Sequence, residues 1–284
     1  MRNFYLHTID KSKTFNLNTP SALAAEPTGL GNAFATEYKD SNDGKHLVNV
    51  KPSFDPIKLK IYFNGDGSNG YVNYKSLMSF LAMCGTSSFL FEYDDGVTDK
   101  FCEVVAKTMP KRDIDEEGIF AEEFTFERQT FWYEEIEQSF SLRKIQNEMG
   151  YPLQFPFRFE GVTFTKEYLI KNQFFIKSPV DITIKGKITN NVQVYIKDAT
   201  TGEIVSQIQL STGNSEGTVI TIRPTTKKIL VEDSDGNITN GYGLTDKTKQ
   251  SFLYLPQGNY YIGSNMDDED TGEIAISIKR YLFD

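Results

Sequence analysis

The sequence predicts a mainly β protein: an N-terminal β-rich domain with one helix over residues 1–150, and a C-terminal antiparallel β-sandwich over residues 151–284. Three observations predict this fold class. Short runs in the second half alternate apolar and polar residues, which is the period of a half-buried strand. The first half adds one stretch with a helical period. Between the halves, residues 151–159 hold two prolines among aromatic residues, which predicts an extended connection.

The first half predicts one helix, a hairpin and a further strand. Five apolar residues fall on one helical face, and Gly85 is placed to end the helix; they are Tyr74, Leu77, Met78, Leu81 and Cys84. Residues 89–93 and 100–107 are expected to pair across Asp94-Asp95-Gly96. Next comes a strand in which Phe120, Phe124 and Phe126 alternate with Ala121, Glu123, Thr125 and Glu127. Residues 14–51 are polar and weakly patterned, which predicts a loop or an arm exchanged with a neighbouring copy.

The second half predicts many short strands at regular spacing. They are expected around residues 180–188, 192–196, 204–210, 220–222, 229–231, 252–255, 260–262 and 274–278. Polar turns separate several of them, at 198–202, 233–237 and 256–259. We expect 252–255 and 260–262 to form one hairpin across the last of these turns. The absence of a helical period among these runs indicates an antiparallel sandwich.

The composition excludes several classes of function. The chain has 284 residues, 30 Lys and Arg against 39 Asp and Glu, a net charge of −9, two His and two Cys. An acidic chain is unsuited to neutralising phosphates by its surface. So few His and Cys leave little material for a metal site or a nucleophilic triad, so we expect no enzyme, no catalytic residue, no cofactor and no metal. No run approaches the ~20 apolar residues that span a bilayer, so no membrane insertion is expected.

Acidic residues concentrate in one stretch, residues 111–137. It holds ten carboxylates against three basic residues, and its first seven carboxylates are Asp113, Asp115, Glu116, Glu117, Glu122, Glu123 and Glu127. One interpretation is a solvated sheet face. The other is a surface that repels a polyanion or meets a basic partner.

The order of these motifs is more specific than any one of them. A first half of strands, one helix and the Phe91-Glu92-Tyr93 hairpin leads to the aromatic stretch 124–133. The Phe155-Pro156-Phe157-Arg158-Phe159 junction and the strand 182–188 follow. In this order the sequence resembles the distal tail proteins of siphophages, the phages with long, non-contractile tails, that infect Gram-positive bacteria.

The resemblance implies a structural phage tail and baseplate hub. The N-terminal domain would form a homo-hexameric ring, and the C-terminal sandwich would be similar to galectins. The ring would join the tail tube to the host-adsorption apparatus, with the tail tube protein, the tail-associated hub protein and receptor-binding or baseplate proteins as partners. DNA would pass through it without specific binding, which leads us to expect that the acidic stretch faces the lumen. The protein would be made in the host cytoplasm and reside in the virion, at the phage tail tip.

A carbohydrate-binding protein that recognises host cell-wall polysaccharide is the alternative. Aromatic rings can stack on sugars, and the candidate platforms are Trp132, Tyr133, Tyr260 and Tyr261. Galectin-type sugar sites use Trp and His, and residues 151–284 contain neither. For that half, a docking platform for other baseplate proteins is therefore favoured over a sugar site of the galectin type.

Overall fold

The computed structural model describes residues 2–63, 70–85, 87–111, 120–141, 167–265 and 272–282. The chain divides into two compact units, Met1–Glu134 with Tyr281–Asp284, and Glu135–Arg280. The described strands pair in antiparallel fashion, and the mainly β fold with one α-helix is confirmed. The expected domain boundary at residue 150 and the aromatic junction 151–159 lie outside the described residues, so both stay predictions.

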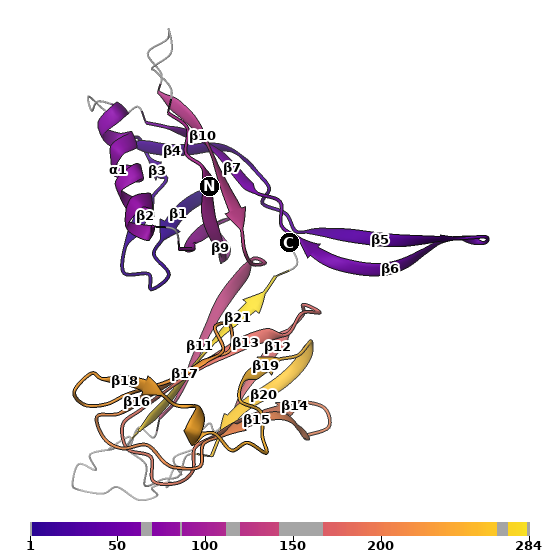
Figure 1. Ribbon diagram of the computed structural model, residues 1–284, viewed down its shortest axis with the longest axis vertical. Helices are drawn as coiled ribbons and strands as arrows, with labels where there is room; N and C mark the ends of the chain where they lie inside the picture. The colour runs from indigo at the N-terminus through magenta and orange to yellow at the C-terminus, as the bar shows by residue number, and fades with distance from the viewer. Residues whose placement is uncertain are drawn as a thin grey trace, which may run out of the picture. The chain divides into compact units, whose positions relative to one another are not determined.

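The first unit is built on one antiparallel sheet (Figure 1). Its strands follow one another across the sheet in the order β2-β1-β8-β9-β10-β7-β4-β3. The bounds are β1 Asn3–His7, β2 Thr14–Asn16, β3 Asn18–Thr19, β4 Ala22–Thr28, β7 Ile57–Tyr62, β8 Phe89–Asp94, β9 Asp99–Thr108 and β10 Ala121–Arg128. Two further strands, β5 Ala33–Ser41 and β6 Gly44–Ser53, pair only with each other among the described strands.

The helix α1, Gly70–Cys84, covers an aromatic core in the first unit. Tyr74, Leu77, Phe80 and Leu81 are its buried residues. The Tyr74 ring meets the rings of Phe63, Phe120 and Phe124 at centroid distances of 5.5, 5.5 and 6.4 Å. Gly85 adopts φ = +65° and donates its N–H to the carbonyl oxygens of Leu81 and Ala82. The predicted helix and its glycine stop are therefore confirmed.

The hairpin and the strand expected after the helix are also present. β8 and β9 pair from Phe89 opposite Val104 to Asp94 opposite Asp99. The Asp95 carboxylate accepts the backbone N–H groups of Val97 and Thr98, which fixes the turn. In β10, Phe124 and Phe126 are buried with no exposed surface. The alternation of Phe with Glu and Thr in the sequence thus marks a strand with one face in the core.

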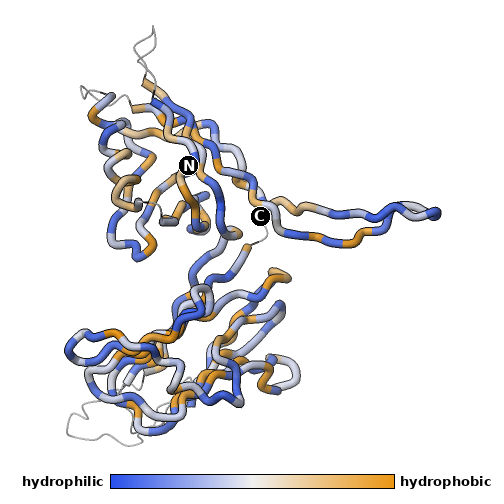
Figure 2. The backbone as a smooth tube through the Cα atoms, in the orientation of Figure 1, coloured by the Kyte–Doolittle hydropathy of each residue, from blue (hydrophilic) through white to orange (hydrophobic). Residues whose placement is uncertain are grey.

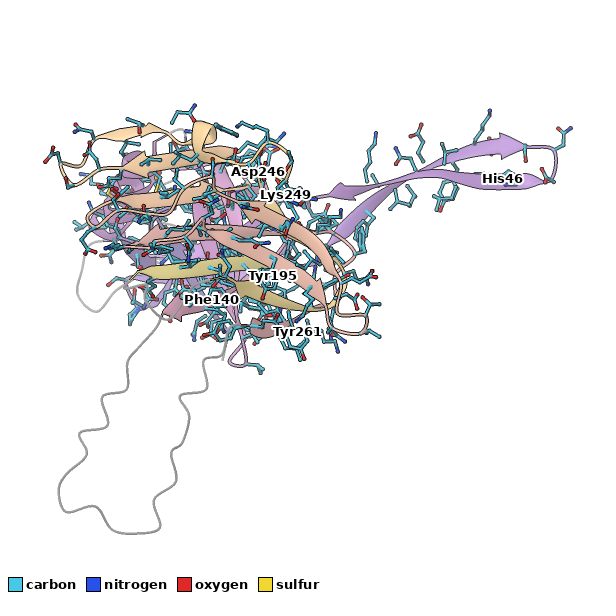
Figure 3. The ribbon with its side chains drawn as sticks, turned by 90° about the horizontal axis from the view of Figure 1, so that it is seen from below. His46, Phe140, Tyr195, Asp246, Lys249 and Tyr261 are labelled. Atoms are coloured by element: carbon cyan, nitrogen blue, oxygen red, sulfur yellow. The ribbon has the colours of Figure 1, made fainter. Side chains whose placement is uncertain are left out.

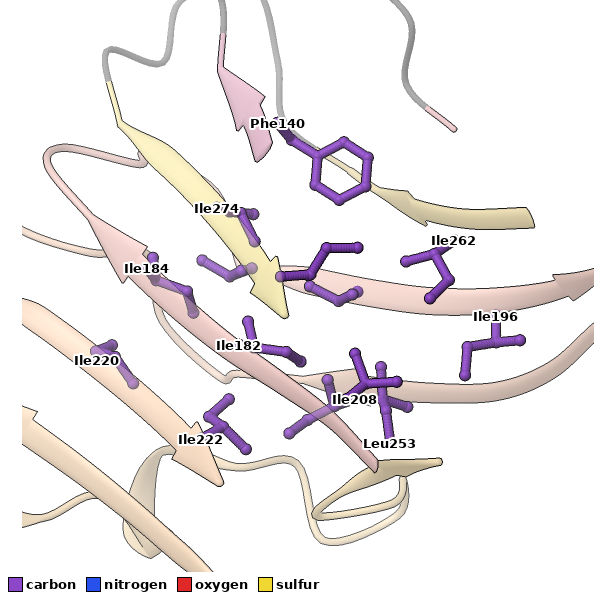
Figure 4. Close-up of a cluster of buried hydrophobic side chains, with 14 of the residues drawn as sticks. Phe140, Ile182, Ile184, Ile196, Ile208, Ile220, Ile222, Leu253, Ile262 and Ile274 are labelled. Carbon is purple, nitrogen blue, oxygen red and sulfur yellow. The ribbon is translucent and has the colours of Figure 1, made fainter. Parts of the chain in front are cut away.

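The second unit is an antiparallel sandwich of two sheets. One sheet runs β18-β17-β16-β13-β21-β11, with β19 also on β13, and the other runs β12-β20-β14-β15. The bounds are β11 Tyr133–Ser141, β12 Glu167–Asn172, β13 Ser178–Lys185, β14 Gln193–Asp198, β15 Ile204–Gln209, β16 Val219–Arg223, β17 Lys228–Glu232, β18 Ile238–Asn240, the 3-10 turn η1 Tyr242–Leu244, β19 Leu253–Leu255, β20 Gly258–Ser264 and β21 Glu273–Tyr281. The facing isoleucines, such as Ile182, Ile196 and Ile262, form its core (Figure 4).

One predicted pairing is wrong. The segments 252–255 and 260–262 are both strands, but they do not form a hairpin. β19 pairs with β13, and β20 pairs with β12 and β14. The turn between β19 and β20 therefore crosses from one sheet to the other. Alternation shows that a strand has a buried face, but two strands that face a shared core from opposite layers have the same pattern.

Candidate functional site

The most prominent feature of the first unit is an arm made of β5 and β6, residues Ala33–Ser53. The strands pair from Ala33 opposite Ser53 to Ser41 opposite Gly44. At the tip, Gly44 adopts φ = +135°, and the Asp43 carboxylate accepts the Ser41 hydroxyl, which lowers the pKa of Asp43 below its ordinary value. The arm extends away from the rest of the first unit (Figures 1 and 3), with His46 close to its tip. Residues 14–51 are expected from the sequence to form a loop or an exchanged arm. The expectation is wrong for β2, β3 and β4, which belong to the sheet, whereas residues 33–51 do lie in an arm. Exchange of the arm with a neighbouring copy stays a prediction.

Apolar side chains lie exposed along this arm. Tyr38, Leu47, Val48 and Val50 are 55, 55, 59 and 47% exposed. Tyr38 and Leu47 are cross-strand partners, and hydrophobic residues are visible along β6 in Figure 2. A two-stranded hairpin without a packed face is marginally stable in water. Exposed apolar residues grouped on a projecting element mark an interaction surface.

Aromatic rings anchor the root of the arm, which consists of residues 29–34 and the segment just after β6, in the first unit. Phe34 at the start of β5 and Phe54 just after β6 both contact the Phe131 ring, at centroid distances of 6.2 and 5.0 Å. Gly29, before the arm, adopts φ = +75°, and a Cβ there would lie 2.1 Å from the carbonyl oxygen of Pro56. Only glycine fits that close approach of the two chain segments.

A buried arginine ties the root together. Arg128, at the end of β10, is 2% exposed. Its Nη1 donates to the Gly31 carbonyl at 2.6 Å and its Nη2 to the Asn32 Oδ1 at 2.9 Å. The guanidinium lies 5.2 Å from the Trp132 ring centroid and 5.6 Å from that of Phe54. Burial lowers the pKa of Arg128, and the charge of Asp55 opposes that shift. These contacts fix the segment from which β5 begins.

The returning end of the chain completes the root. The Leu282 N–H donates to the Trp132 carbonyl at 2.9 Å, and the Asn32 amide donates to the Leu282 carbonyl at 3.1 Å. The Tyr281 ring contacts Phe131 at 5.9 Å. The Trp132 indole N–H donates to the Leu30 carbonyl at 2.6 Å. Segments far apart in the sequence thus meet where the arm starts.

The structure divides the predicted acidic stretch. Glu122 is 2% exposed and lies on the same strand face as Phe124 and Phe126, whereas Glu123 and Glu127 are exposed on the other face. Glu122 therefore cannot contribute to an acidic surface, because successive side chains of a strand point to opposite faces. Four of the predicted residues, Asp113, Asp115, Glu116 and Glu117, lie outside the described residues.

Two of the four candidate stacking platforms are corrected. Trp132 and Tyr133 are 1% and 0% exposed, so neither presents a ring face to a sugar. Tyr260 packs against the core of the second unit and donates its hydroxyl to the Gln257 carbonyl. Tyr261, the next residue of β20, points to the other face of the sheet and is half-buried. A stacking role remains open to Tyr261 alone among the four.

His7 and Cys102, two residue types that often act in catalysis, are buried or nearly buried in the first unit. His7 is nearly buried, with Nδ1 2.8 Å from the Thr14 hydroxyl and Nε2 2.5 Å from the Glu92 carboxylate. Cys102 is fully buried, which raises the pKa of its thiol well above the ordinary value. Within the described ranges, no group of three His, Cys, Asp or Glu side chains could hold a metal ion. No described helix is long and apolar enough to cross a membrane.

Comparison with known proteins gives the family of the first unit. Residues 3–129, from β1 through β10 and including the arm, match the family model described as the distal tail protein, N-terminal domain. The first unit therefore contains the N-terminal domain of the phage distal tail proteins. This match indicates a structural protein of the phage tail and baseplate, and a component of the virion.

Two solved structures are similar to the whole chain. A chain of the phage P2 baseplate in its activated conformation with calcium aligns with a TM-score of 0.68 and 15% identity, over 100% of this chain and 99% of that chain. The SPP1 Dit protein, a paradigm of the hub adsorption apparatus in phages that infect Gram-positive bacteria, aligns with a TM-score of 0.59 and 11% identity, over 99% and 100%. These likenesses show a common fold for both units. No curated protein matches the sequence.

Proposed function

We propose that this distal tail protein forms a hexameric ring that joins the tail tube to the host-adsorption apparatus. The observation that carries the proposal is the arm β5–β6, which projects from the first unit with Tyr38, Leu47, Val48 and Val50 uncovered. A surface of this kind is completed by a partner. In our proposal the partner is the next copy of the chain.

An arm that reaches a different surface of the next copy makes a head-to-tail interface. Such an interface generates a closed ring when its rotation closes. Covering the rest of each apolar side chain on the arm contributes on the order of 1 kcal/mol per residue. Since every copy both extends an arm and receives one, the contribution repeats at each interface. The six-fold symmetry rests on the resemblance to the family.

The rigid root supports this role, because an arm needs a fixed direction to close a ring. Arg128, Trp132 and Phe131 hold the segments on both sides of the arm. A flexible root would allow arms to reach copies at many angles, which favours open chains of copies over a ring.

We propose that the lumen of the ring, through which DNA would pass, is acidic. Glu123 and Glu127 are exposed on β10. The proposal also retains Asp113, Asp115, Glu116 and Glu117, which lie outside the described residues, and it omits Glu122. Negative charge along a channel repels the phosphates of passing DNA. The second unit is proposed to hold the receptor-binding or baseplate proteins.

Mass measurement on an arm variant tests the proposal. Replacing Tyr38, Leu47, Val48 and Val50 with Thr removes apolar surface from the arm without touching the core. We expect the full chain to form hexamers and this variant to remain monomeric in analytical ultracentrifugation. The matched control replaces four other exposed residues with Thr, namely Val97, Ile204, Val205 and Ile238. The control is expected to remain hexameric. Hexamers that survive the arm substitutions, or a control that dissociates as the arm variant does, would contradict the role of the arm.

A further inference from the structure

A groove of about 590 Å³ lies along β12 in the second unit. β12 is an end strand of the four-stranded sheet. Leu169 and Lys171 line the groove from β12, Asn259 and Tyr261 from β20, and Arg280 from β21. These residues come from three separate stretches of sequence, so the groove is a product of the sandwich rather than of one loop.

The charge of the groove is opposite to that of the chain. The protein carries 39 acidic against 30 basic residues, yet Lys171 and Arg280 line the groove and none of its described lining residues is acidic. The Arg280 Nη1 donates to the Lys171 carbonyl at 3.1 Å, which holds the guanidinium beside β12. Glu167, the nearby carboxylate on β12, is engaged by Lys197 at 2.6 and 2.7 Å.

The groove also offers an apolar and aromatic wall. Leu169 is 60% exposed and is the cross-strand partner of Tyr261. Tyrosine rings and aliphatic side chains pack against the C–H faces of sugar rings. Asn259, Thr200 and Gln138, which also line the groove, supply side-chain donors and acceptors for hydroxyl groups.

Neighbouring side chains hold Tyr261 in place. The Lys197 Nζ lies 5.5 Å from the Tyr261 ring centroid. Lys197 is in turn held by Glu167, which accepts the Tyr195 hydroxyl at 3.0 Å. Gly263 makes room for Tyr195, because a Cβ at Gly263 would lie 2.5 Å from the Tyr195 ring. Figure 3 shows Tyr195 and Tyr261 on this unit. A ring that is already positioned binds with less loss of side-chain entropy.

We propose that this groove binds an anionic polysaccharide, with Tyr261 and Leu169 against the sugar and Lys171 and Arg280 on its phosphate or carboxylate groups. Guanidinium and ammonium groups form strong, charge-assisted hydrogen bonds with both anions. The site goes beyond the proposed ring and does not depend on it, since all its residues belong to the second unit.

Two other polyanions fit the groove less well. An acidic polypeptide would use the two cations but has no need of an exposed Tyr and Leu beside them. Nucleic acid needs an extended basic track, and the groove offers two cations in an acidic chain. An acidic polypeptide and a nucleic acid therefore serve as comparison probes in the test.

Calorimetric titration of the full chain with defined polymers tests the proposal. The probes are a glycosylated poly(glycerol phosphate), polygalacturonate, neutral dextran, polyglutamate and single-stranded DNA. We expect binding of the phosphate polymer, the carboxylate polysaccharide or both, which identifies the anion. Dextran, polyglutamate and DNA are expected to bind at least about tenfold more weakly. Binding is expected to weaken as salt increases.

Variants locate the site. Lys171→Gln with Arg280→Gln is expected to weaken binding about tenfold or more, because both charge-assisted contacts are lost. The matched control, Arg223→Gln with Lys228→Gln, removes the same charge from a cross-strand pair on β16 and β17 and is expected to leave affinity within about twofold. Tyr261→Ala is expected to lose binding, whereas Tyr261→Phe keeps it. Circular dichroism confirms that each variant is folded.

Three results would overturn the proposal. One is that neither anionic polysaccharide binds. Another is that polyglutamate or DNA binds as tightly as the anionic polysaccharides, which would indicate that the groove binds any polyanion by charge alone. The third is equal weakening by the groove variant and by the control variant. The oligomeric state of the same samples tests the ring separately, so failure of one proposal is distinguishable from failure of the other.

Discussion

At the scale of single residues, Arg128 links the end of β10 to the segment before the arm. It is a buried cation whose guanidinium is held by a backbone carbonyl, an amide oxygen and two aromatic rings. Burying a charge is costly unless its hydrogen bonds are made. The Gly31 carbonyl and the Asn32 side chain accept from its two Nη atoms, whereas its Nε has no hydrogen-bond partner among the described residues. The arginine and the arm root therefore depend on each other.

Replacing this arginine is expected to destabilise the first unit. Arg128→Met keeps the length of the side chain but leaves the Gly31 and Asn32 oxygens without their donor, which costs about 2–3 kcal/mol of unfolding free energy. Fluorescence of Trp132, the only Trp in the chain, follows the unfolding of this unit in urea. The control Arg223→Met changes an exposed side chain and is expected to have almost no effect. Equal effects of the two substitutions would contradict the role given to Arg128.

The Glu167–Lys197 pair predicts a pH dependence in the second unit. The Lys197 ammonium, helped by the Tyr195 hydroxyl, lowers the pKa of Glu167 below its ordinary value. A lowered pKa in the folded state contributes stability above the ordinary pKa, and this is lost as the pH falls through the folded-state pKa. Glu167→Gln is therefore expected to be less stable than the parent at pH 7 and to lose less stability on acidification. Denaturation followed by circular dichroism between pH 7 and about pH 2 measures this.

Side-chain burial was only partly predictable from the sequence. The alternation of Phe124 and Phe126 with polar residues marks the buried face of β10, and it is confirmed. The same alternation places Glu122 on that buried face. The high number of carboxylates in residues 111–137 instead suggests that they all lie on one exposed surface. Trp132 and Tyr133 are adjacent and both buried. Alternation cannot predict this, because it assumes that one face of the strand meets water.

At the scale of elements, the helix and the sandwich strands were predictable because each has one buried face. The arm was not predictable as a hairpin for the opposite reason. Its strands are exposed along most of their length, so no core imposes a period on residues 33–53. The pairing of β19 and β20 was mispredicted because the alternation within a strand does not show which strand pairs with it.

The arm root depends on an element from the far end of the sequence. A chain that ends at Arg280 lacks Tyr281 and Leu282, and so loses the Phe131 ring contact and the backbone bond to Trp132. We expect faster amide hydrogen exchange at residues 29–34 and unchanged exchange in the core strand β13. Tyr281→Phe, which keeps the ring and the backbone, is the control. Unchanged exchange at residues 29–34 in the shortened chain would show that the root is self-sufficient.

At the scale of the whole molecule, the two units have separate hydrophobic cores. The first unit, which contains the span matched by the family model, carries the arm. The second unit carries the basic groove. An acidic chain of this kind suits a conduit for DNA better than a binder of DNA, because like charges repel.

Single-particle electron microscopy of the full chain tests the central claim most directly. We predict closed rings of six copies, about 194 kDa from six times 32.3 kDa, in which the arm of each copy lies against the next copy. Monomers at every concentration, or rings in which residues 33–53 contact no neighbour, would contradict it.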